Sequence, residues 1–276
     1  MLTGALSNGE LIYFAVYLAI GGVISGVLAG LFGIGGGAIL VPVFYQVFGL
    51  LGVDESVRMH IAVGSSLAII LPTAITSYRA HSKRGAVDKE LLKSYTFAVP
   101  AGVVLASLTA AYISSGGLRI VFAVLTLLIG LRLLFNRESW RLGNDIPANP
   151  LRGMIGGAIG FFSTLMGIGG GALNNAFMTV YGRPMLQAVA TSSGVGVLIA
   201  IPGIFGYMWA GWGNPYLPPL STGFINWLAV ALIIPLTLIF APFGVKLAHA
   251  LPRRKLELGF AFFMLFVSAR FFVSLL

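Results

Sequence analysis

Apolar stretches of about the length that crosses a bilayer recur along the whole chain. They lie near residues 11–32, 60–78, 91–113, 117–135, 187–210, 225–248 and 256–276. An α-helix needs about 20 apolar residues to cross the hydrocarbon core of a bilayer. The strands of a membrane β-barrel would instead alternate polar and apolar residues. These stretches do not alternate, so the sequence predicts an all-α polytopic membrane protein.

Charged residues are too scarce to cover a water-facing surface. They make up 9% of the 276 residues, whereas hydrophobic residues make up 58%. Roughly a quarter of the residues of a soluble domain are charged. The net charge of +9 comes mainly from cations in short loops, where the positive-inside rule places them, so it does not indicate nucleic-acid binding. The chain has no cysteine, which excludes disulfides and thiolate metal sites, and we predict no cofactor.

A six-residue motif divides the chain into two related parts. GIGGGA occupies residues 33–38 and returns at residues 167–172, about half a chain later. Ser65-Ser66 can likewise be aligned with Ser192-Ser193. Internal repeats of this kind are common in secondary transporters. We therefore predict an N-terminal transmembrane repeat, a polar linker and a C-terminal transmembrane repeat, at residues 1–140, 137–150 and 150–276 respectively.

Loop charges predict that the two repeats have inverted topology. The loop at 79–90 is basic, and its equivalent at 211–223 has no charge. The loop at 113–117 has no charge, and its equivalent at 249–255 is basic. Basic loops stay in the cytoplasm, so equivalent loops lie on opposite sides and both termini are expected outside. The start, MLTGALSNGE, has no basic n-region, so we expect the first apolar stretch to be retained.

The two glycine motifs are expected to break helices. Each glycine costs up to about 1 kcal/mol in a helix interior relative to alanine. The helix that follows such a break offers unpaired N–H groups and the positive end of its dipole, which together attract an anion. Each repeat is therefore expected to contain about three full spans and a glycine-broken helical hairpin, which is either re-entrant, as we favour, or a pair of tilted spans. The candidate substrate-binding residues are Gly35, Gly36, Gly37, Ala38, Gly169, Gly170, Gly171 and Ala172.

Tight helix packing is the alternative interpretation of these glycines. Small residues four positions apart allow membrane helices to approach closely. Gly22, Gly26 and Gly30 have this spacing, and so do Gly156 and Gly160. We assign that role to these two rows, and favour binding for the contiguous glycines because they occur in both repeats.

Polar residues near the glycine motifs extend the candidate site. Buried amides need partners in a membrane, so adjacent asparagines after the second motif are candidates for binding. Serine and threonine usually bond a local carbonyl instead, which is the alternative for the hydroxyls. The substrate-binding candidates of this kind are Ser65, Ser66, Asn174, Asn175, Thr191, Ser192 and Ser193. His60 and Gln187 are candidates for coupling or gating, although His60 also fits an interfacial position beside Arg58.

Four segments of the first half together resemble a known family. They are GVLAGLFGIGGGAILVPVF, AVGSSLAIILPTAITSYRAHSKRGAVD, AVPAGVVLASLTAAYI and LRIVFAVLTLLIGLRLLF, and the second half adds GIGGGALNNAF and TSSGVG. This combination is similar to the sulfite exporter TauE/SafE family, also called TSUP. The resemblance implies a bacterial or archaeal cytoplasmic (inner) membrane transporter for sulfite or for organosulfonates such as taurine, isethionate and sulfoacetate.

Transport by alternating access is the function we expect, with an anion channel or uniporter for small carboxylate or inorganic anions as the alternative. The chain lacks the P-loop pattern of a nucleotide hydrolase. An intramembrane enzyme would need a buried catalytic set, and Ser66 or Ser192 with His60 is the only pair that the sequence offers, so we do not expect an enzyme. The expected partners are a small anionic substrate and the lipid bilayer. The coupling ion, proton or sodium, and the oligomeric state stay open.

Overall fold

The computed structural model describes residues 16, 19–27, 37–135, 142–143, 145–250 and 252–275. Gly35 and Gly36, much of the stretch near 11–32 and part of the linker at 137–150 lie outside these residues. Within them the chain is almost entirely helical, as predicted, and six helices are long and apolar enough to cross a membrane.

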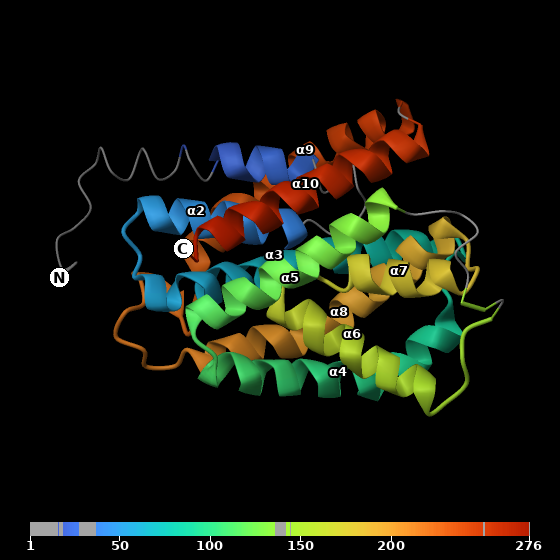
Figure 1. The fold of residues 1–276 in the computed structure, drawn as a ribbon, viewed down its shortest axis with the longest axis horizontal. Helices are drawn as coiled ribbons and strands as arrows, with labels where there is room; N and C mark the ends of the chain where they lie inside the picture. The colour runs from blue at the N-terminus through green and yellow to red at the C-terminus, as the bar shows by residue number, and fades with distance from the viewer. Residues whose placement is uncertain are drawn as a thin grey trace.

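The helices follow one another in the order of the expected spans (Figure 1). Residues 19–27 are helical. The first half continues with α2 (Gly37–Leu50), α3 (Glu55–Lys83), α4 (Lys89–Tyr112) and α5 (Ser115–Leu134). The second half contains α6 (Leu151–Leu165), α7 (Gly171–Val180), α8 (Met185–Ala210), β1 (Ser221–Thr222), β2 (Ile225–Asn226), α9 (Trp227–Ala250) and α10 (Arg253–Val273).

Side-chain caps set where three of the spans begin. The Asp54 carboxylate accepts the backbone N–H of Ser56, and this bond and the Ser56 hydroxyl bond lower the pKa of Asp54. Because of this cap, α3 starts earlier than the apolar stretch at 60–78 predicts. Asp88 and Ser114 cap α4 and α5 in the same way.

The predicted packing role of the spaced glycines is confirmed on α6. A Cβ atom at Gly160 would collide with the backbone carbonyl of Val99 in α4. A Cβ atom at Gly156 would lie 2.6 Å from the ring of Tyr95, one turn away. The two helices therefore cross at backbone distance, which only glycine permits.

The same kind of contact recurs between residues 19–27 and α9. A Cβ atom at Gly22 would lie 2.9 Å from the Leu236 side chain, and one at Gly26 would lie 3.0 Å from the Thr237 backbone. Each close crossing thus joins a helix that precedes the glycine motif of one half to a span of the other half. Gly30 lies outside the described residues.

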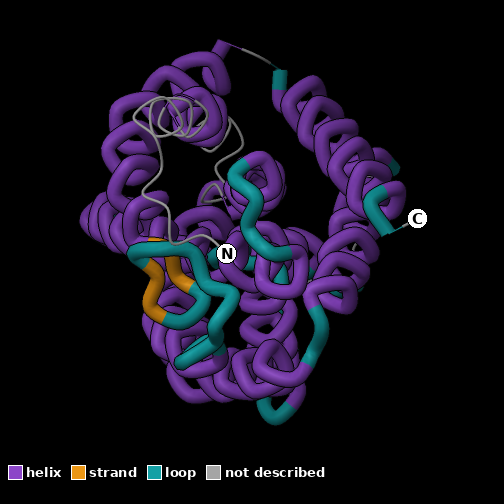
Figure 2. Tube along the Cα trace, turned by 90° about the vertical axis from the view of Figure 1, so that its left-hand side faces the viewer, coloured by secondary structure: helices purple, strands orange, loops and turns teal. Residues whose placement is uncertain are grey.

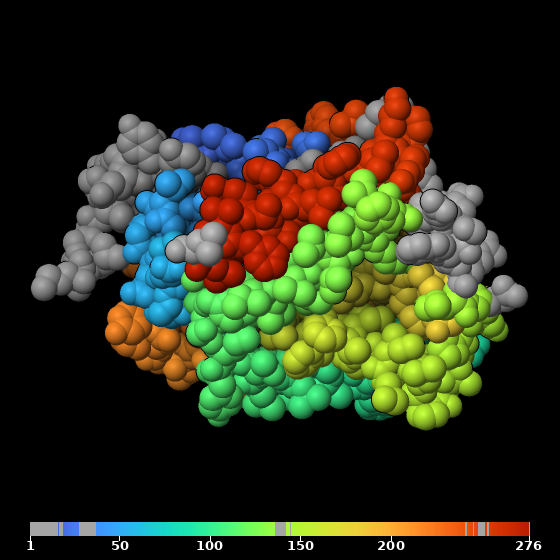
Figure 3. Space-filling model, in the orientation of Figure 1, coloured from blue at the N-terminus to red at the C-terminus, as the bar shows by residue number. Residues whose placement is uncertain are grey.

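Arginines fasten α5 and α10 into an antiparallel pair. Arg254, at the start of α10, donates to the carbonyls of Leu133 and Leu134 at 3.1 and 2.7 Å. Arg119, near the start of α5, donates to the carbonyl of Ser274 at 2.9 Å. Each cation meets carbonyls that the end of the partner helix leaves unpaired. The space-filling view shows α10 lying along α5 between these points (Figure 3).

The α6–α7 hairpin enters and leaves at one end of the bundle. The Leu142 amide, before α6, donates to the carbonyl of Val180 at the end of α7, at 3.1 Å. Arg183 and Asp145 pair nearby at 2.7 Å. The second hairpin is therefore re-entrant, which decides between the two interpretations of its short helices.

The two ends of the bundle differ in charge. One end joins the basic loops, because Arg152 pairs with Glu90 and Arg254 reaches the end of α5. The opposite end joins the uncharged loops: the His60 ring lies tilted against that of Phe224, and its Nε2 lies 3.1 Å from the carbonyl of Ile113. The strands and the end of α10 lie at this second end (Figure 2). An inverted repeat predicts this arrangement, and the inversion itself stays a prediction.

Cysteine labelling tests the predicted orientation. In this cysteine-free chain, Gly213→Cys should react with an impermeant maleimide on intact cells, whereas Ser82→Cys should react only after permeabilisation. The untouched wild type controls for background labelling. Labelling of both positions from the same side would refute the inverted topology.

Candidate functional site

The two glycine motifs meet inside the bundle. A Cβ atom at Gly37, the first residue of α2, would collide with the carbonyl oxygen of Gly167 and lie 2.9 Å from the Cα of Ile168. The second motif is broken as predicted, since α6 ends at Leu165 and α7 starts at Gly171. Gly167 and Gly170 have φ angles of 64° and 74°, which favour glycine. Segments half a chain apart thus touch through their backbones.

Helix α3 passes directly over this contact, which we call the glycine crossing (Gly37 with Gly167–Gly170). The Ser66 hydroxyl donates to the carbonyl of Gly167 at 2.9 Å. Ile70 lies one turn further along, with side-chain atoms 2.7 Å from a Cβ built on Gly37 and 2.6 Å from one built on Gly169. Ile70 was not among the sequence candidates, because an apolar residue in an apolar span carries no signal.

A polar network lies between α7 and α8. Asn174 donates through Nδ2 to the Ser192 hydroxyl at 2.8 Å, and that hydroxyl donates to Oδ1 of Asn175 at 2.6 Å. The three side chains are 0, 6 and 3% exposed. The structure therefore brings together three candidates that the sequence places in two separate segments.

The network leaves one donor group and one acceptor free. A hydroxyl has a single hydrogen, so Ser192 donates to one asparagine and accepts from the other. Nδ2 of Asn175 and Oδ1 of Asn174 are buried without a hydrogen-bond partner among the described residues. Turning both amides round would reverse the bonds and still leave one amide nitrogen and one carbonyl oxygen free. Buried polar atoms are usually paired, so these two atoms are available to a polar ligand.

A cation lies beside this network. Arg132 of α5 donates through Nη2 to the carbonyl of Ala176 at 3.0 Å, one residue after Asn175. The arginine is half-buried, which makes its field stronger than that of a fully exposed cation. An anion near Asn175 would be attracted by this charge.

The remaining hydroxyl candidates hold the backbone. The Ser65 hydroxyl accepts the Asn226 amide at 3.0 Å, and the Thr191 hydroxyl accepts the Asp88 amide at 2.9 Å. Ser193 donates to Ala190 on its own helix, as the alternative interpretation of membrane hydroxyls expects. Ala38 and Ala172 are buried at the starts of their helices.

His60 and Gln187 lie at opposite ends of the bundle. His60 is 3% exposed and lies against the loops at the uncharged end of the bundle, so its interfacial position stays a prediction. Its ring centroid lies 4.6 Å from that of Phe224. Gln187 lies half-buried on the first turn of α8, near the basic loops. Neither is part of the Asn174–Ser192–Asn175 network.

Comparison with known proteins decides the family. The profile of the sulfite exporter TauE/SafE family matches residues 18–271, nearly the whole chain. The chain belongs to the TauE/SafE family. A probable membrane transporter protein of Haemophilus influenzae is 32% identical over 254 residues, covering 92% of this chain and 96% of the relative.

More distant relatives are similar over most of their length. A probable membrane transporter protein of Methanocaldococcus jannaschii is 29% identical, over 90% of this chain and 92% of its own. YunE of Bacillus subtilis, also named a probable membrane transporter protein, is 27% identical over 87% and 89%. No solved structure matches the chain significantly. This TauE/SafE protein is thus a multi-pass membrane transporter, which implies a small-molecule substrate.

Two neighbouring serines of α8 test the network. Ser192→Ala removes the bond to each asparagine and should destabilise the ligand-free protein by about 1–3 kcal/mol, because both amides lose a buried partner. Ser193→Ala loses only a bond within its own helix and should change stability by less than about 0.5 kcal/mol. Thermal unfolding in detergent measures both. Equal effects would show that the network is not a buried polar unit.

Proposed function

We propose that this TauE/SafE transporter carries sulfite or small organosulfonates, such as taurine, isethionate and sulfoacetate, across the cytoplasmic membrane by alternating access. The observation that carries the proposal is the two buried atoms without a partner, Oδ1 of Asn174 and Nδ2 of Asn175, about one helical turn after Gly170. The residues proposed to bind substrate are the candidates of the two glycine motifs together with this network. We do not propose an enzymatic activity.

Neutral donors suit an anion that must be released again. A sulfonate buried without partners would be very unfavourable, whereas a fixed arginine in direct contact would bind it tightly. Nδ2 of Asn175 and the first N–H groups of α7 offer partial positive charge, and Arg132 adds attraction from beyond the carbonyl of Ala176. Each neutral hydrogen bond contributes about 0.5–1.5 kcal/mol, so a few give an affinity in the micromolar to millimolar range.

The free carbonyl of Asn174 favours a substrate that also donates. Isethionate has a hydroxyl and taurine an ammonium two carbons from the sulfonate, so each can supply oxygens to Asn175 and a hydrogen to Asn174. Ethanesulfonate lacks that hydrogen and would leave Oδ1 of Asn174 unpaired. Within the proposed class, the polar network thus favours isethionate and taurine over sulfoacetate, whose ionised groups only accept hydrogen bonds.

The way in which the hairpins enter supports alternating access. The α6–α7 hairpin enters from the basic end, proposed to be cytoplasmic, and the first half is proposed to send its hairpin from the opposite end. The two meet at the glycine crossing, so rocking one half against the other would open the site to either side in turn. Both termini would then lie outside. The alternative is a uniporter or channel, and a dependence of transport on a proton or sodium gradient would distinguish the carrier from it. His60 and Gln187 are the candidate residues for such coupling.

Transport by Asn175→Leu tests the proposal. In proteoliposomes, wild type should take up radiolabelled isethionate, and isethionate should compete about 3- to 10-fold better than ethanesulfonate, as one hydrogen bond predicts. Asn175→Leu is close in size and removes the free donor, so uptake should fall at least about tenfold.

Thr179→Val, one turn further along α7, is the matched control. Its hydroxyl bonds only carbonyls of its own helix, those of Asn175 and Ala176, so uptake should stay near that of wild type. The proposal fails if Asn175→Leu transports as well as this control, or if no sulfur anion is taken up.

A further inference from the structure

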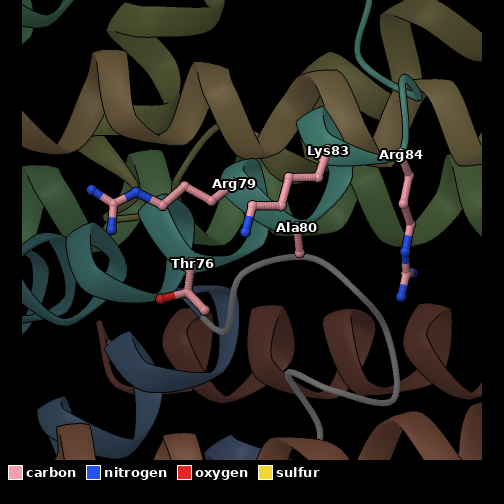
Figure 4. Close-up of a pocket in the computed structure, with 5 residues that line it drawn as sticks. All are labelled: Thr76, Arg79, Ala80, Lys83 and Arg84. Carbon is pink, nitrogen blue, oxygen red and sulfur yellow. The ribbon is translucent and has the colours of Figure 1, made fainter.

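A cavity of about 400 Å³ opens at the basic end of α3, away from the polar network. Thr76, Arg79, Ala80, Lys83 and Arg84 line it. The Lys83 side chain lies between those of Arg79 and Arg84 (Figure 4). Three cationic side chains thus border one cavity, to which no role has been assigned so far.

These cations have no acidic partner among the described residues. Four other arginines of the described chain do pair with carboxylates, at 2.7 to 3.5 Å: Arg119, Arg152, Arg183 and Arg254. The Thr76 hydroxyl donates to the carbonyl of Pro72 and has no hydrogen left to offer. Like charges held close together repel one another, so the cavity favours a ligand that brings negative charge.

The cavity lies at the end of α3, the helix that passes over the glycine crossing. Thr76, Arg79 and Lys83 have the spacing of one helix face. Ile70, which touches both glycine motifs, lies nine residues before Arg79 on α3, or about 14 Å at 1.5 Å per residue. An anion bound in this cavity would therefore lie near the glycine crossing.

We propose that this basic cavity is a second binding site, which takes an oxyanion group through the guanidinium groups of Arg79 and Arg84 and the ammonium of Lys83. Guanidinium groups pair with planar or tetrahedral oxyanions through two hydrogen bonds, and the ammonium adds a point charge. The group is the sulfonate or sulfite of a free anion, or the phosphate of a lipid head group. If the ligand is a substrate anion on its way to the glycine crossing, the inference rests on the proposed function. The binding of an oxyanion group in the cavity does not depend on that function.

The test compares two double variants that remove the same charge. Arg79→Gln with Lys83→Gln alters the cavity, and Lys89→Gln with Lys93→Gln removes two exposed cations of α4 that do not line it. Both are made in the Asn175→Leu background, so that binding at the crossing does not mask binding in the cavity. Binding of radiolabelled sulfite is measured in phosphatidylcholine nanodiscs at low salt. Retention of phosphatidylglycerol is measured by native mass spectrometry.

The cavity variant should differ from the control in one of the two arms. If the ligand is a free anion, sulfite affinity falls about tenfold, and the difference shrinks in about 0.5 M potassium chloride because salt screens exposed charges. If the ligand is a lipid, phosphatidylglycerol retention is lost while sulfite binding is unchanged. Equal behaviour of the two variants in both arms, or no binding of either probe by the unaltered cavity, would overturn the inference.

Failure of the proposed function would appear elsewhere. It would be seen if the Asn175→Leu single variant, with Arg79, Lys83, Lys89 and Lys93 unchanged, transported isethionate as well as the wild type does. That result leaves the comparison of the two double variants valid. Because all four substituted cations are exposed, loss of folding is not expected to complicate either arm.

Discussion

The rest of the structure depends on the backbone contact between the two glycine motifs. At Gly37 a side chain as small as alanine's would collide with the carbonyl of Gly167. Because the contact is made by backbone, it can place helix starts and carbonyls of both halves within reach of one ligand. In water such exposed peptide groups would be solvated, but in a membrane they must be paired within the protein. Ser66 supplies one such bond, to Gly167.

The helices around the crossing are joined mainly between halves. Close glycine contacts tie α6 to α4 and residues 19–27 to α9, and arginines fasten both ends of α5 and α10. The α3 and α8 spans pass the centre and carry Ser66 and Ser192 to it. The two halves are thus joined at the glycine crossing and by these further contacts around it.

Much of this frame could be predicted from the sequence. The apolar stretches gave the spans, and the repeated glycines gave the helix break, because hydrophobicity and helix propensity are local properties. The direction of the α6–α7 hairpin could not be predicted, since two short helices look alike whether they turn back or cross. The contact of Leu142 with Val180 and the nearby pair of Arg183 and Asp145 decide it.

The roles of the polar candidates were harder to predict. Ser66 and Ser193 are both serines of membrane helices, yet one bonds another segment and the other its own helix. The two serines differ in which segment packs against them, and a local sequence pattern does not encode that packing. The sequence singles out Asn174 and Asn175 as neighbours, but their connection through Ser192 depends on how α7 lies against α8.

A structure of the protein with bound selenite would test the central claim most directly. Selenite has the shape and charge of sulfite, and its selenium can be located by anomalous scattering. Our account predicts a selenium peak at the glycine crossing, with a selenite oxygen within about 3 Å of the amide nitrogen of Asn175. A peak confined to other parts of the molecule, with Asn174 and Asn175 bonded only to protein groups, would contradict it.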